Sequence, residues 1–124
     1  MSVSSSRVLI TALLFVVVFA SGFWMNRSGK PYSILLLTAH KLVALGALAL
    51  LVVIVYQQHQ DAALSTGELV ASVVTVLLFV ATIITGGLIS SELELPAVVI
   101  LSHLLLPFLT AIASGGTLVL LATR

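Results

Sequence analysis

The sequence predicts an all-α fold, a transmembrane up-down-up-down four-helix bundle, and three observations lead to it. Of the 124 residues, 60% are hydrophobic and 7% are charged, with a mean hydropathy of +1.31, whereas soluble globular chains carry about 25% charged residues. The apolar residues form four runs of about the 20 residues that a helix needs to cross the hydrocarbon core. The polar links between the runs are short, so neighbouring helices should run antiparallel. We treat residues 1–124 as a single membrane domain.

The first two helices are expected at residues 8–25 and 32–56. The first apolar run ends near Trp24, and the second is flanked by Tyr32 and Tyr56, which fits the aromatic belt of a membrane interface. Pro31 stands just before the second helix, where a missing amide hydrogen costs little. A cleavable signal peptide ending near Ala20 is the alternative for the first run. A retained helix is the simpler interpretation because the apolar run continues past that position.

The last two helices are expected at residues 69–89 and 95–121, with 57–68 as the polar link before them. Ser65 and Glu68 have the spacing of a capping box, which indicates a helix start. Pro96 is expected in the first turn of the fourth helix. We recognise no internal repeat in the sequence.

Composition excludes several classes of function. The chain has no cysteine, so disulfides, thiolate catalysis and cysteine-ligated metals are excluded. The net charge of +1 gives no reason to expect a nucleic-acid partner. All four acidic residues lie in links or at helix ends, on both sides of the predicted membrane. Catalysis by side chains is therefore not expected, and the oligomeric state is left open.

Two histidines, His40 and His103, lie inside the predicted membrane region, where ionisable residues usually face the bundle interior and serve a function. At about 1.5 Å of rise per residue, His40 lies about 13 Å beyond Pro31 and His103 about 10 Å beyond Pro96. The second and fourth helices should run in the same direction, so the two histidines are expected at nearly the same depth.

This pairing predicts a haem site. Helices two and four of a four-helix bundle lie on a diagonal of about 14 Å, too far for two imidazoles to touch. The space suits a flat cofactor with one axial ligand on each face, and histidine nitrogen is a standard axial ligand of haem. We therefore expect one haem b, its iron bound by His40 and His103. Zinc would need about four ligands close together, which the predicted core does not offer.

Small and polar residues accompany the two histidines. Ala44 follows His40 by one turn, and Gly22, Gly86 and Gly87 are expected to admit the porphyrin edge or a close helix. Thr82 lies near the height of the histidines. Thr82 and backbone carbonyls are the candidates for hydrogen-bonding the outer ring nitrogens of the imidazoles.

The cations on the same side are candidates for the haem propionates. Arg27 and Lys41 lie towards the interface nearer the histidines, and Lys41 has a simple alternative as a lipid-facing residue that snorkels to the headgroups. Three Lys or Arg on that side against two on the other leave the orientation unresolved.

One histidine on each of two helices at matching depth resembles the four-helix membrane cytochromes b, namely the respiratory cytochrome b subunits and the cytochrome b561-type proteins. The resemblance covers the core topology, and it implies electron transfer with a quinone or a redox protein in a prokaryotic-type cell membrane. It departs from the two-haem members, since Ile54 and Thr117 stand where a second histidine pair would be needed. One haem would exchange electrons on one side of the membrane.

The competing hypothesis is a membrane scaffold or assembly subunit without redox activity, in which both histidines are packing residues. Another metal, another pigment or a proton-relay role are further alternatives. A Soret band from purified protein would separate the cytochrome from the scaffold.

Overall fold

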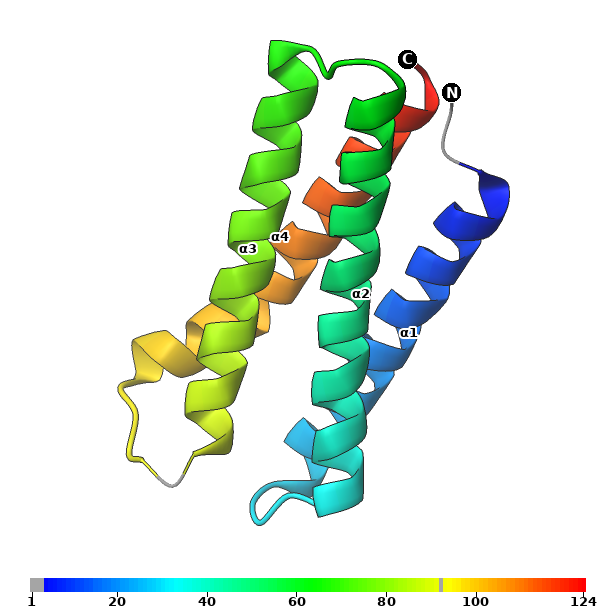
Figure 1. The fold of residues 1–124 in the computed structure, drawn as a ribbon. Helices are drawn as coiled ribbons and strands as arrows, with labels where there is room; N and C mark the ends of the chain where they lie inside the picture. The colour runs from blue at the N-terminus through cyan, green and yellow to red at the C-terminus, as the bar shows by residue number, and fades with distance from the viewer. Residues whose placement is uncertain (1–3, 92) are drawn as a thin grey trace.

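Four α-helices make up the computed structural model, which describes residues 4–91 and 93–124 (Figure 1). They are α1 (Ser5–Ser28), α2 (Ile34–Asp61), α3 (Thr66–Ser90) and α4 (Ala97–Ala122). No strand occurs in the described residues. The all-α class and the four predicted helices are confirmed. The order in which the helices cross a membrane stays a prediction.

All four helices are long and apolar enough to span a bilayer. Many large apolar side chains point outward, including Ile34 at 83% and Leu35 at 81% exposed. Water would penalise so much exposed apolar surface, whereas lipid would cover it. Length, composition and exposure together indicate an integral membrane protein.

The helix ends follow the capping signals, with two corrections. The Ser65 hydroxyl accepts a hydrogen bond from the Glu68 amide, and the Glu68 carboxylate accepts one from the Ser65 amide, which confirms the capping box. Pro96 is the N-cap of α4, one residue before its first turn. The expected link from residue 57 is wrong in its first part, because α2 continues to Asp61. Glutamine is a good helix former, and Gln57 accepts a hydrogen bond from Arg7 on α1.

The chain forms two helical hairpins, α1 with α2 and α3 with α4, whose helices pack mainly against each other. Figure 1 shows the two hairpin loops at one end, and the start of α1 and the end of α4 beside the α2–α3 loop at the other. Lys30 Nζ donates to the Ser91 carbonyl at 3.1 Å and so joins the two hairpin loops. At the opposite end, Arg124 donates to the Gln58 carbonyl at 2.8 Å. We call these the loop end and the terminal end.

The hydrophobic core fills only the half of the bundle near the terminal end. Its most buried side chains are Leu51, Ile54 and Leu121, each at most 1% exposed. By contrast, among the described residues no side chain from 26 to 46 on the first hairpin, or from 80 to 109 on the second, is buried. Both histidines belong to this less covered half.

Candidate functional site

The two intramembrane histidines occupy equivalent places in the two hairpins. His40 lies six residues beyond the first residue of α2 (34 to 40), and His103 lies six beyond the first residue of α4 (97 to 103). Each histidine is thus about 9 Å along its helix from the loop end. Both rings are half-buried. The two histidines thus have matching positions along their helices, and their equal depth in a membrane stays a prediction.

His40 is held by α1. Its Nδ1 lies 2.8 Å from the hydroxyl oxygen of Ser21, a buried residue one helix away. The Ser21 hydroxyl also donates to the Val18 carbonyl at 3.1 Å, within its own helix. The serine therefore links the imidazole to the backbone of α1.

His103 is held in the same way by α3. Its Nδ1 lies 2.9 Å from the hydroxyl oxygen of Thr85. That hydroxyl is also 3.0 Å from the Ala81 carbonyl and 3.0 Å from the Thr82 carbonyl, to which it donates. A second hydroxyl thus links the second imidazole to its own hairpin.

The direction of these contacts depends on which ring nitrogen carries the proton. A hydroxyl has one hydrogen to donate and two lone pairs that accept. If Ser21 and Thr85 give their hydrogens to the backbone carbonyls, each hydroxyl accepts from an Nδ1–H, and the Nε2 lone pair is left for a ligand role. A neutral imidazole with this tautomer is a ready metal ligand.

Two glycines allow the rings to lie close to the neighbouring helix. A Cβ atom added at Gly22 would lie 3.1 Å from Cε1 of His40, and one at Gly86 would lie 2.8 Å from Cε1 of His103. Gly86 therefore cannot be replaced without moving the ring. Both glycines were predicted near the site, although here they contact the imidazoles, and their role beside a porphyrin edge stays a prediction. Gly87 has nothing within 4 Å of an added Cβ and faces open space.

Thr82 was a candidate partner of an outer ring nitrogen, as were backbone carbonyls. The backbone of Thr82 is a hydrogen-bond partner of His103, whereas its side chain bonds elsewhere. Its hydroxyl donates to the Leu78 carbonyl at 2.7 Å and lies 3.0 Å from the hydroxyl of Thr110. Ala44 is partly exposed one turn after His40. The two predicted cations are both exposed. Lys41 follows His40 directly in sequence, whereas the Arg27 guanidinium lies over the Phe23 ring, 5.8 Å from its centroid.

Sequence reasoning missed Ser21 and Thr85, and it also missed the repeat to which they belong. Each hairpin carries a hydroxyl residue followed by glycine on its first helix and a histidine on its second. The hydroxyl-to-histidine separations are 19 residues from Ser21 to His40 and 18 from Thr85 to His103. A search for this pattern across the two hairpin loops would have found it.

Comparison with known proteins finds no match to this chain among family models, curated proteins or solved structures. Its function is therefore argued from its own residues. Among the described residues there is no group of three or more histidine, cysteine or acidic side chains placed to hold a metal. A metal cofactor that brings its own equatorial ligands needs fewer ligands from the protein.

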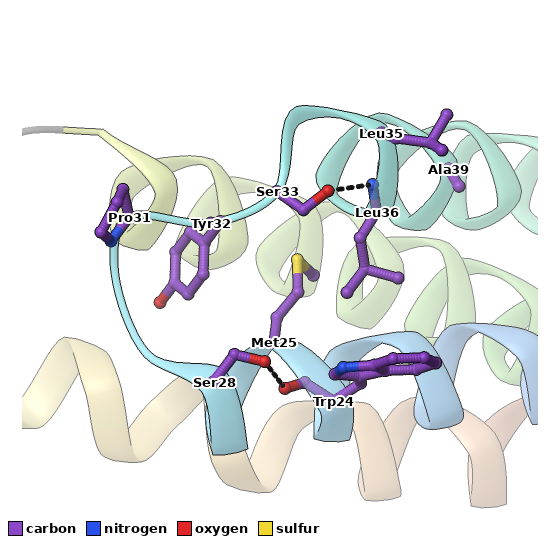
Figure 2. A pocket seen from close by; sticks show the side chains of 9 residues that line it. All are labelled: Trp24, Met25, Ser28, Pro31, Tyr32, Ser33, Leu35, Leu36 and Ala39. Carbon is purple, nitrogen blue, oxygen red and sulfur yellow. Dashed lines mark hydrogen bonds between the residues drawn. The ribbon is translucent and has the colours of Figure 1, made fainter.

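A cavity of about 610 Å³ opens beside the first hairpin loop, between the end of α1 and the start of α2 (Figure 2). Trp24, Met25 and Tyr32 form much of its wall, and Figure 2 shows Met25 reaching across from α1 towards Leu36 on α2. Neither histidine lines it. The cavity is thus separate from the site, and its aromatic residues fit the predicted interfacial belt.

Proposed function

We propose that this protein is a membrane b-type cytochrome that binds one haem b between its two hairpins, with His40 and His103 as axial ligands. The observation that carries the proposal is the matched pair of imidazoles, one from each hairpin, each six residues beyond the start of its helix and each with Nδ1 beside a hydroxyl of the neighbouring helix. Haem iron has four equatorial ligands from the porphyrin, so two such nitrogens complete its coordination.

The packing around the histidines fits a large flat group. The hydrophobic core cluster lies on the terminal-end side of the histidines, and the described side chains of α2, α3 and α4 in the loop-end half are at most partly covered, while Ser21 and Met25 of α1 are buried there. A second haem site near the terminal end has no such space and no histidine pair. Ile54 is completely buried in the core, and the Thr117 hydroxyl lies 2.8 Å from that of Thr75.

When bound, haem supplies one-electron oxidation and reduction at its iron. The chain contributes the two imidazoles, the apolar helices that exclude water and the cations Arg27 and Lys41, which we assign to the propionates. The site lies about 9 Å from the ends of α2 and α4 at the loop end. We infer that electrons exchange with a quinone or a redox protein on that side. In this role the chain is an electron carrier.

The proposal is tested by the visible spectrum of protein purified after expression with haem available. Wild type should show a Soret band and the sharp reduced α and β bands of low-spin haem b. His40→Ala and His103→Ala should each lose the low-spin bands. His59→Ala is the matched control, because His59 lies at the terminal end and its Nδ1 accepts from the Leu64 amide.

Two results would overturn the proposal. One is a wild type that stays colourless when haem is added to folded protein. The other is a low-spin spectrum that survives removal of both intramembrane histidines. The first result would favour the scaffold hypothesis, in which Ser21 and Thr85 satisfy the half-buried imidazoles for packing alone, and the second would mean that haem binds at another site.

A further inference from the structure

The two hairpins repeat one local arrangement with independent residues. Ser21 and Gly22 on α1 meet His40 on α2, and Thr85 and Gly86 on α3 meet His103 on α4. In each case the glycine removes a Cβ that would strike the ring, and the hydroxyl lies within hydrogen-bonding distance of Nδ1. Each hairpin is thus a half-site with its own ligand and its own support for that ligand.

We propose that Ser21 and Thr85 are positioning residues that fix the tautomer and the direction of the two imidazoles, and thereby set the midpoint potential of the haem. The tautomer part of this inference stands on the structure alone. The potential part rests on the proposed function.

The hydrogen-bond directions give the physical reason. Each hydroxyl donates to a carbonyl of its own helix, Ser21 to Val18 and Thr85 to Ala81 and Thr82, so its lone pairs face the imidazole. A membrane interior offers no water as a substitute acceptor. Removal of the hydroxyl would take away this acceptor from the Nδ1–H, and the proton could then move to Nε2, the atom needed for iron.

The same hydrogen bond tunes the ligand. An imidazole whose outer N–H donates to an acceptor is a more basic ligand than one without that bond. A more basic ligand favours the ferric state over the ferrous state. Loss of either hydroxyl should therefore raise the midpoint potential and weaken haem binding by about 10- to 100-fold, the usual effect of removing an outer-shell partner.

The first experiment is nitrogen-15 NMR of histidine-labelled apoprotein, which needs no haem. The chain has three histidines, so His59→Ala and single substitutions assign the signals. We expect protonated Nδ1 and unprotonated Nε2 at His40 and His103. Ser21→Ala should abolish this tautomer at His40 only, and Thr85→Ala should abolish it at His103 only. Protonated Nε2 at both histidines in the wild type would overturn the inference.

The second experiment is a redox titration of haem-loaded protein. Ser21→Ala and Thr85→Ala should raise the midpoint potential, while Ser21→Thr and Thr85→Ser should restore it because they keep the hydroxyl. Ser102→Ala is the matched control, since Ser102 adjoins His103 but donates to the Val98 carbonyl of its own helix at 2.6 Å. Alanine variants with wild-type potential and haem affinity would overturn the potential part. If the wild type bound no haem, the proposed function would fail, and the NMR result would still decide the tautomer part.

Discussion

At the scale of single residues, Gly86 provides a sharp test of ring placement because its neighbour in sequence is a natural control. A Cβ at Gly86 would lie 2.8 Å from His103, whereas a Cβ at Gly87 would meet nothing within 4 Å. We expect Gly86→Ala to lower haem occupancy and Gly87→Ala to leave it unchanged, as measured by haem absorbance per protein. Alanine favours a helix by about 1 kcal/mol over glycine, so helix loss would not explain the effect. Equal occupancy in both variants would contradict the ring placement.

The sequence predicted the matching positions of the two histidines along their helices and missed the hydroxyl partners, for a reason visible at this scale. Depth depends only on residue number and the constant rise of a helix. The partner of a ring nitrogen depends on how far each helix is rotated about its axis, which packing decides. Thr82 and Thr85 differ by one turn of α3, and of their two hydroxyls that of Thr85 is the one bonded to His103.

At the scale of helices, hydroxyl pairs between α3 and α4 join the second hairpin inside its core. The hydroxyls of Thr75 and Thr117 lie 2.8 Å apart, and both residues are at most 2% exposed. We expect a double-mutant cycle with Thr75→Val and Thr117→Val to give a coupling of about 0.6 kcal/mol, within a range up to about 1.7 kcal/mol. Unfolding in mixed micelles measures it. Thr123→Val is the control, since Thr123 bonds only to carbonyls of its own helix end.

Helix existence was easier to predict than helix length. The four apolar runs each had the length of a membrane span, and each forms a helix. The end of α2 was predicted at residue 56 because residues 57–61 are polar, yet the helix runs on to Asp61. Polarity marks where a helix leaves the lipid, whereas the helix itself ends where the backbone loses its hydrogen bonds. The two boundaries need not coincide.

At the scale of the whole molecule, the hydrophobic core joins the two hairpins near the terminal end, and the proposed haem would join them nearer the loop end. Side chains join the hairpins near the terminal end, where Leu51, Ile54 and Leu121 are buried. In the half nearer the loop end, the hairpins are joined by the hydrogen bond from Lys30 to Ser91 and by the rings of Phe19 and Phe108, whose centroids are 5.2 Å apart. Haem bound to one ligand from each hairpin would add a further link there, because binding to the folded state alone stabilises that state.

This division predicts that haem narrows the distance distribution between the hairpins at the loop end only. The chain has no cysteine, so spin labels attach at introduced pairs alone. Ser28→Cys with Ser90→Cys reports on the loop end, where α1 and α3 finish, and Ser6→Cys with Thr123→Cys reports on the terminal end. Electron–electron double resonance should show a broad distribution of spin-label distances at the loop end in apoprotein, and this distribution should narrow on haem addition. The distance distribution of the terminal pair should not change, because the hairpins are already joined there by packed side chains.

In a background with His40→Ala and His103→Ala, haem should narrow neither distribution. Narrowing at both ends, or narrowing without the histidines, would mean that haem does not bridge the hairpins at this site.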